Sequence, residues 1–303
     1  MLATVGALAP VFLMIALGAL LRARGFVDDA FWSGAERLVY RLLLPALLVL
    51  TTAGSDFSEF RVLPVAAALI AAILLTAGFA VVLRPWLGID DAAFTSAFQG
   101  AIRTNSYVGL AGAGALYGEA GFTVMGIVVF VVITAVNVLS VVALIWYGAR
   151  PTGGRAIAAA VLQNPLILAC LIGFALNAAG LGLPGLAHDL LEILGRASLP
   201  LGLLCVGAGL DLSRAGASPR AIGAVLALKL LIMPAATAAF CVLFGVEGVT
   251  AGAAVLFTAV PISASAYVLA RQLGGDAPLM AGLITLTTLA AFITMPITVA
   301  LFT

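Results

Sequence analysis

The segment AGSDFS at residues 53–58 returns as AGLDLS at residues 208–213, 155 positions further along the chain. The same spacing relates the longer stretch from Pro10 to Pro64 to a second copy. The residues that are identical in the two copies include Pro10, Gly18, Gly25, Arg41, Pro45, Gly54, Asp56, Ser58 and Pro64. Their counterparts in the second copy are Pro165, Gly173, Gly180, Arg196, Pro200, Gly209, Asp211, Ser213 and Pro219. Such matches are harder to obtain by chance than Leu or Ala matches in so apolar a chain. A unit of about five apolar segments that occurs twice is a known plan of secondary transporters, so the repeat favours transport.

The composition is that of a membrane protein. Hydrophobic residues make up 64% of the 303 residues and charged residues 9%, whereas a soluble domain carries about 25% charged residues. The mean hydropathy is +1.24. A formal net charge of +1 excludes a broad nucleic-acid-binding face, because such faces need many uncompensated cations.

Few residues could hold a metal ion or a cofactor. The three cysteines, Cys170, Cys205 and Cys241, lie in apolar segments, where they are expected to pack as small hydrophobic side chains. His188 is the single histidine, and the chain has no Cys-x-x-Cys pair. We therefore expect no metal site and no cofactor.

The N-terminal apolar run is expected to be a retained helix. Val5–Leu21 follows no basic segment and ends in Arg22 and Arg24 rather than in a small-residue cleavage site, which argues against a signal peptide. All but one of the 14 basic residues are arginine, and Ala and Gly are abundant. This usage is typical of a GC-rich bacterial genome, so we expect a multi-pass protein of a bacterial cytoplasmic membrane.

A membrane-spanning helix needs about 20 mostly apolar residues, and the sequence offers ten such segments. The predicted spans are Leu2–Leu21, Leu38–Ala53, Val62–Leu83, Ala92–Leu116, Phe122–Tyr147, Leu162–Ala179, Leu190–Leu210, Ala221–Phe244, Val249–Ala270 and Leu279–Phe302. The fold class predicted is therefore an all-α membrane protein. Residues 1–150 form the first five-helix repeat and residues 151–303 the second.

The distribution of arginine orients these spans. With ten spans, nine basic residues fall on one side, which the positive-inside rule assigns to the cytoplasm. They are Arg22, Arg24, Arg37, Arg84, Arg150, Arg155, Arg214, Arg220 and Arg271. The opposite side holds Arg61, Glu119, Asp189 and Glu247. Both termini are then outside, and because five is an odd number the two repeats must be inverted relative to one another.

Two predicted spans are interrupted at matching places. The fourth carries GAIRTNSYVGLAG at residues 100–112, and the ninth carries AVPISASAYVLA at residues 259–270. Small polar residues and proline halfway across a membrane release backbone groups that a cavity, water or a ligand must satisfy. We therefore expect the two broken helices to cross near the midplane and to form the substrate site. The candidate residues at the breaks are Arg103, Asn105, Ser106, Pro261, Ser263 and Ser265; the bland alternative is a pair of packed kinks.

Arg103 is the most informative single residue of this set. A guanidinium at the centre of a bilayer costs several kcal/mol, so it should face a cavity or a partner. Beside Asn105 and the N-terminal end of a half-helix it suits a carboxylate or another anion. The alternative is an arginine that reaches the interface or pairs with backbone carbonyls.

Other polar residues in the spans are weaker candidates. Lys229, the only lysine, either lies near the site or extends to the cytoplasmic surface along its methylene groups. Asn137 is a site candidate or interhelical glue. Arg41 and Arg196, near helix ends, are expected to anchor or cap those helices, with Asp56 and Asp211 closing them. No Asp or Glu falls at the centre of an apolar segment, so the plainest group for proton or cation coupling is lacking.

These residues together resemble the auxin efflux carrier family, which includes the plant PIN carriers and bacterial proteins linked to malate or malonate. The resemblance rests on ten spans in two inverted fives, on Arg103-x-Asn105, on Pro261 and on Lys229 followed by Pro234. It implies an elevator-type carrier, often a homodimer. Helices 1, 2, 6 and 7 would form a scaffold, and helices 3–5 and 8–10 a transport domain. Asn105 and Pro261 would be the crossover residues of the two halves.

The chain departs from the plant pattern in two ways that argue against auxin as the substrate. Ala101–Arg103 stand where a matching proline would be expected, and the loop from Gly148 to Val161 is short. We expect instead the export of a small organic anion of the carboxylate class, with the lipid bilayer and a second copy of the chain as further partners.

Two alternatives remain open. The first is a sodium- or proton-coupled carboxylate symporter of the related bile-acid carrier type, because Na⁺ can be held by backbone and Ser or Asn oxygens. The second is a membrane-embedded enzyme or sensor. The chain has no His-Glu-x-x-His, no Gly-x-Ser-x-Gly and no output domain, so no enzymatic activity is expected.

Overall fold

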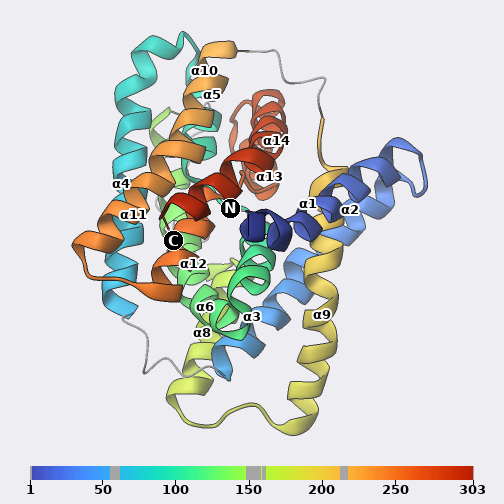
Figure 1. The fold of residues 1–303 in the computed structure, drawn as a ribbon. Coiled ribbons are helices and arrows are strands. Elements are labelled where there is room, and N and C mark those ends of the chain that lie inside the picture. The colour runs from blue at the N-terminus through green and yellow to red at the C-terminus, as the bar shows by residue number, and fades with distance from the viewer. Residues whose placement is uncertain (1, 55–61, 148–157, 159–161, 212–217, 303) are drawn as a thin grey trace.

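The computed structural model describes residues 2–54, 62–147, 158, 162–211 and 218–302, and every regular element among them is helical (Figure 1). The elements run in the order α1 (Leu2–Ala23), α2 (Asp29–Leu38), η1 (Val39–Leu43), α3 (Leu44–Ala53), α4 (Val62–Leu87), α5 (Asp91–Ile102), α6 (Ser106–Tyr147), α8 (Pro165–Ala178), α9 (Gly185–Ala208), α10 (Pro219–Ala227), η3 (Leu228–Ile232), α11 (Met233–Leu243), α12 (Gly248–Ala259), α13 (Ser265–Leu273) and α14 (Ala277–Phe302).

Six stretches of the described chain are long and apolar enough to cross a membrane. They are Thr4–Ala23, Val62–Leu87, Asp91–Tyr147, Gly185–Ala208, Pro219–Leu243 and Ala277–Phe302. The difference from the ten predicted spans has local causes. The predicted fourth and fifth spans fall within the single stretch Asp91–Tyr147, and the predicted sixth and ninth correspond to shorter helices. The predicted second lies in the helical stretch from α2 to α3, which carries the charged residues Glu36, Arg37 and Arg41.

Several sequence features used above lie outside the described residues. They are Asp56 and Ser58 with their counterpart Ser213, the arginines Arg61, Arg150, Arg155 and Arg214, and nearly all of the loop 148–161 with the boundary between the two halves.

The helices begin where a polar side chain can accept hydrogen bonds from the first free amides. Asp28 caps α2 by accepting from Phe31 N at 2.7 Å. Asp90 caps α5 in the same way, with Ala93 N at 2.8 Å. With this cap the second helical stretch begins at Asp29, nine residues before the predicted Leu38.

Two helical stretches contain a five-residue π segment just before a proline. η1 precedes Pro45 and η3 precedes Pro234, and in each the residue that follows the segment bonds a carbonyl five residues back: Leu44 N to Val39 O, and Met233 N to Leu228 O. Proline has no amide hydrogen to donate, and in a regular α-helix its ring collides with the carbonyl four residues back. The wider π turn before each proline relieves this steric clash.

Small residues bring helix backbones together where α1 meets α9 and where α8 meets α3. A methyl group on Gly18 of α1 would collide with the carbonyl of Leu204 in α9. A methyl group on Gly173 of α8 would collide with Thr52 of α3 and lie 3.1 Å from the carbonyl of Val49. Gly18 and Gly173 are 155 residues apart, as are Val49 and Leu204. The α1–α9 contact thus has a counterpart in the α8–α3 contact.

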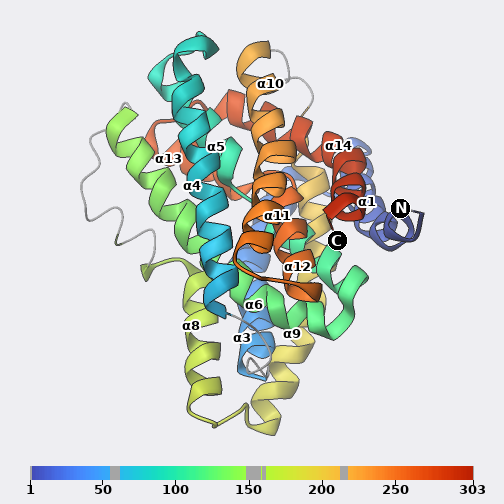
Figure 2. The same cartoon turned by 60° about the vertical axis from the view of Figure 1, so that its left-hand side comes forward.

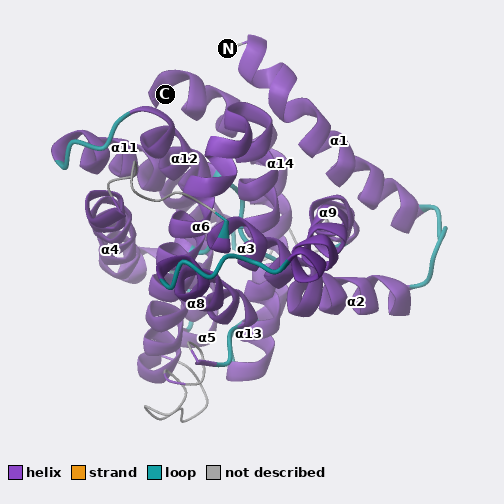
Figure 3. Ribbon diagram, turned by 90° about the horizontal axis from the view of Figure 1, so that it is seen from below, coloured by secondary structure: helices purple, strands orange, loops and turns teal. Residues whose placement is uncertain are grey.

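The helices pack as two groups. In the first, α1 packs along α9, and α3 packs against both α8 and α9. In the second, α4 packs against α11 and α6, and α12 packs against α6, α11 and α14. Figure 2 shows α8, α3 and α9 extending below the second group, and Figure 3 shows α1, α2 and α9 together at its edge. α6 touches both groups.

Corresponding stretches of the two halves run in opposite directions. In Figures 1 and 2 the chain rises along α4 and descends along α10 and α11, which lie beside it. Likewise α3 descends and α9 rises. Gly118 and Gly274 turn the chain at matching places with φ of 58° and 85°. Gly118 combines this φ with a ψ of −140°, a conformation open only to glycine.

We expect Gly18→Ala to destabilise the protein by about 1–3 kcal/mol, because the new methyl group meets backbone that cannot move aside. Gly6→Ala in the same helix is the matched control, since nothing lies within 4 Å of its added methyl group. That control should be neutral or stabilising by up to about 1 kcal/mol. Thermal denaturation in detergent measures both; equal midpoints for the two variants would contradict the close contact.

Candidate functional site

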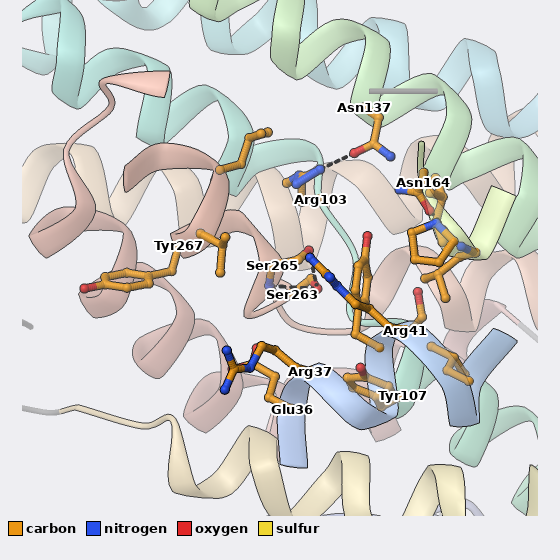
Figure 4. Close-up of a pocket in the computed structure, with 18 of the residues that line it drawn as sticks. Glu36, Arg37, Arg41, Arg103, Tyr107, Asn137, Asn164, Ser263, Ser265 and Tyr267 are labelled. Carbon is orange, nitrogen blue, oxygen red and sulfur yellow. Dashed lines mark hydrogen bonds between the residues drawn. The ribbon is translucent and has the colours of Figure 1, made fainter. Parts of the chain in front are cut away.

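A cavity of about 1010 Å³ lies between the two groups of helices (Figure 4). It is bounded by α2 and η1, by the break between α5 and α6, by the middle of α6, by the start of α8 and by α13. Its polar lining residues are Ser33, Glu36, Arg37, Tyr40, Arg41, Arg103, Thr104, Ser106, Tyr107, Asn137, Gln163, Asn164, Ser263, Ser265 and Tyr267. The cavity therefore has the size and the mixed polar and apolar lining of a small-molecule site.

The first break separates α5 from α6. α5 ends at Ile102, and Arg103 is extended, with φ −76° and ψ 142°. Asn105 then caps α6: its Oδ1 accepts from Tyr107 N at 3.1 Å and from Val108 N at 3.3 Å. The amides at this new helix N-terminus carry partial positive charge at the floor of the cavity.

The second break separates α12 from α13. Val260 is extended, and Ile262 N donates to Thr287 Oγ1 at 3.3 Å. Ser263 Oγ and Ser265 Oγ lie 3.0 Å apart and line the cavity from this side. The two breaks meet in one main-chain hydrogen bond, from Asn105 N to Pro261 O at 2.9 Å.

Arg103 carries a buried positive charge without a carboxylate partner in the described chain. Its side chain is 6% exposed and lines the cavity. Nη2 donates to Asn137 Oδ1, while Nε and Nη1 have no hydrogen-bond partner among the described residues. Because an uncompensated buried charge is costly, Arg103 favours an anion in the cavity beside it.

Arg37 and Arg41 form an exposed cationic rim around the same cavity. From its place near a helix end we expected anchoring or capping by Arg41 rather than substrate contact; the structure places its side chain in the cavity lining. Arg41 lies in η1, whose π turn changes the direction in which its residues face. Its repeat counterpart Arg196 instead pairs with Glu192 at 2.6 Å on α9.

Lys229 does not extend to the surface, so that alternative is wrong, and it lies beside the second break without lining the cavity. Its side chain is fully buried, and Nζ donates to Thr258 O at 2.8 Å and contacts Met233 Sδ at 3.6 Å. Thr258 lies in the last turn of α12, whose carbonyls have no intrahelical partner. The ammonium therefore stabilises the helix end that leads into the second break.

The other predicted site residues divide into two sets. Arg103, Ser106, Asn137, Ser263 and Ser265 line one cavity. Asn105 and Pro261 hold the crossing beneath it through their backbone atoms and the cap.

The sequence analysis did not identify the remaining lining residues, which include Glu36, Tyr40, Gln163 and Asn164. Asn164 could have been found from the Asn-Pro pair, because it caps α8 directly before Pro165, with its Oδ1 2.9 Å from Leu166 N. Glu36 precedes the predicted second span, and Tyr40 is the third residue of that span, so the apolar pattern did not mark either of them as a site residue.

We expect Asn105→Ala to cost about 1–2 kcal/mol of stability, because it removes the acceptor that caps α6. Asn105→Ser keeps a side-chain oxygen at the cap and should recover most of that loss. Thermal denaturation midpoints of the two variants in detergent test this. A serine variant as unstable as the alanine variant would show that capping is not what Asn105 contributes.

Comparison with known proteins identifies a family. The family model described as "Membrane transport protein" matches residues 3–151 and 155–299. A comparison with curated proteins gave no significant match. Since the family match spans nearly the whole chain, and since the fold has the apolar helices that such a protein needs, the chain belongs to the membrane transport protein family, which is the auxin efflux carrier family.

Proposed function

We propose that this membrane transporter exports a small organic anion of the carboxylate class by an elevator-type alternating-access mechanism. The observation that carries the proposal is Arg103, a buried guanidinium with two unpartnered nitrogens in the lining of a large cavity. A carboxylate would accept hydrogen bonds from this planar fork, and charge-assisted bonds of this kind are about twice as strong as neutral ones.

Ten spans in two inverted repeats are part of the same proposal. Its support is the equivalence of the Gly18–Leu204 and Gly173–Val49 contacts and the opposite directions of α4 and α10–α11. Counted through the breaks, α5 with the first part of α6 forms the fourth span, and α12 with α13 forms the ninth. Inverted repeats of this kind place substrate at their interface near the midplane, where broken helices offer free backbone groups.

The elevator mechanism is supported by the division of the helices. The first group, α1 with α2–η1–α3, α8 and α9, corresponds to the proposed scaffold, and the second group to the proposed transport domain. The cavity is lined by residues of both groups. If the second group slid along the first, Arg103 would move with it, while Arg37 and Arg41 would stay in place on the scaffold. We further propose a homodimer built through the scaffold helices, and a bacterial cytoplasmic membrane with both termini outside.

Coupling to a second ion is the main alternative within transport. No Asp or Glu is found among the buried polar residues that the structure describes, which disfavours a proton carried by a carboxylate. A sodium ion held by neutral oxygens is disfavoured beside the uncompensated Arg103, because like charges repel in a medium of low dielectric constant. Membership in a transporter family weighs against the enzyme and sensor alternatives.

We expect Arg103→Ala to abolish the stabilisation that a bound carboxylate confers on the purified protein, because a ligand raises the apparent stability of the state it binds. The probes are acetate, lactate, succinate and benzoate in a thermal-shift assay. Arg103→Lys keeps the charge without the fork and should bind roughly ten- to a hundredfold more weakly, equivalent to about 1.5–3 kcal/mol.

Arg220→Ala is the control for this experiment, since Arg220 is exposed and lies outside the cavity lining. It should respond to each carboxylate as the wild type does. If no carboxylate stabilises the wild type, the substrate class is wrong. If Arg103→Ala responds like the wild type, the site lies elsewhere.

We also expect export of a monovalent anion to run on the membrane potential alone. An anion leaving a cell that is negative inside gains about 2.3 kcal/mol per 100 mV, which supports a roughly fifty-fold gradient. This is tested by measuring anion flux into proteoliposomes while the membrane potential is clamped and a pH gradient is imposed separately. Flux that follows the pH gradient at zero potential and ignores voltage would exclude this uniport mechanism.

A further inference from the structure

The rim of the cavity carries a net positive charge. Arg37 and Arg41 stand one helical turn apart on the continuous stretch of α2 and η1, and both are exposed. Glu36 is the acidic residue among the lining residues that the structure describes, so it offsets one of the two rim arginines. A cleft lined by one sign of charge raises the local concentration of the oppositely charged solute.

The sequence repeat relates this rim to a stretch of α9 that has a different charge. The residues 155 positions after Arg37 and Arg41 are Glu192 and Arg196. Arg196 Nη2 donates to Glu192 Oε1 at 2.6 Å, so the second arginine is neutralised. Asp189 and His188 lie beside Glu192, with the three polar groups within 4.8 Å of one another. With His188 neutral, this patch has a net charge of −1.

The two patches lie on opposite sides of the contact between α3 and α9. A methyl group on Gly195 would be 3.4 Å from Leu47 Cα, which sets the level at which the two helices touch. The helices run in opposite directions (Figure 1), and both Arg37 and Glu192 precede the contact in their own helix. Arg37 therefore lies on one side of the contact level and Glu192 on the other.

We propose that the carrier has two electrostatically unequal mouths: a cationic one at Arg37 and Arg41, which captures the anion, and an acidic one at Asp189 and Glu192, which does not. This inference rests on the proposed alternating access, in which inverted repeats exchange roles as the site opens to the other side. Only the first of these mouths borders the cavity described here.

The expected consequence is kinetic. Favourable charge at the first mouth raises the rate of anion entry there and so lowers the half-saturation concentration on that side. The final gradient reached at a given membrane potential stays the same, because fixed charges supply no energy over a complete transport cycle. Unequal mouths thus tune a passive carrier to work at low anion concentrations on one side.

Cysteine probes at repeat-equivalent positions measure the two local potentials without any need for substrate. Ser33 lines the first mouth, and His188, 155 residues later, lies in the acidic patch with its side chain 51% exposed. Ser33→Cys and His188→Cys are made singly in the full chain, with Cys170, Cys205 and Cys241 changed to alanine. Each is reacted with two membrane-impermeant thiosulfonates, one bearing a sulfonate and one a trimethylammonium group.

The sulfonate reagent should be favoured at Ser33→Cys and the ammonium reagent at His188→Cys. For each cysteine we take the ratio of its reaction rate with the sulfonate reagent to its rate with the ammonium reagent. We expect this ratio to differ roughly tenfold between the two positions at low ionic strength and to become similar in high salt. In vesicles of uniform orientation, each cysteine should react from one side only. Equal ratios at the two positions, or labelling of both from the same side, would overturn the proposal.

Reciprocal charge exchange provides the matched variants. Arg37→Glu places at the first mouth the residue found at the equivalent position of the second, Glu192. It should bring the ratio of reagent rates at Ser33→Cys close to the ratio at His188→Cys. Glu192→Arg does the reverse at the second mouth. Both positions are solvent-accessible, so the fold should tolerate the changes, and thermal midpoints check this. Ratios unmoved by either exchange would also overturn the proposal.

Flux of radiolabelled lactate and succinate gives the functional readout. Arg37→Glu should raise the half-saturation concentration at least roughly threefold on the first side alone, and more for the dianion than for the monoanion. Equal changes on both sides would contradict unequal mouths. A wild type that transports neither anion would count against the proposed function, while the reagent ratios would still decide the charge of the two mouths.

Discussion

The backbone hydrogen bond from Asn105 N to Pro261 O is the contact on which the rest of the site depends. In a membrane every amide and carbonyl must find a partner within the protein, so a helix can break at mid-depth only where another element completes its bonds. Here each break supplies what the other lacks: one offers an amide and the other a carbonyl. Thr287 and Lys229 satisfy further groups beside the second break. The crossing thus pairs one amide of the first break with one carbonyl of the second, and polar residues line the cavity beside it.

Arg103 follows from that arrangement. A guanidinium in the middle of an intact apolar helix would have no access to polar surroundings, but at an extended residue between two helices its side chain reaches the cavity. Asn137 accepts from one nitrogen and leaves two others free. A buried guanidinium with missing hydrogen-bond partners raises the free energy of the protein. An anionic ligand would lower it on binding, because it would supply those partners through charge-assisted hydrogen bonds.

Much of this could be predicted from the sequence, because the relevant signals are local. Pro261 with its neighbouring serines, and Asn105 ahead of an apolar run, predict helix interruptions through backbone chemistry alone. The sequence could not show which way a residue in a continuous helix faces once a π turn intervenes. Arg41 and Lys229 both lie in such segments, and the sequence did not indicate that Arg41 lines the cavity or that Lys229 is fully buried. Glu36 was missed because the predicted second span began too late. Long-range neighbours, such as Thr258 for Lys229, depend on tertiary packing.

The repeat is kept at one pair of close helix contacts and is lost at several charged positions. Gly18 and Gly173 both allow a neighbouring helix to approach within contact of its main chain, and a larger residue at either position would push the helices apart. By contrast, Arg37 corresponds to Glu192, and Lys229 corresponds to Leu74 in the first half. The close helix contacts at Gly18 and Gly173 therefore constrain both halves in the same way. Polar side chains are under no such constraint. A repeated framework of helices can therefore carry a different set of charges in each half.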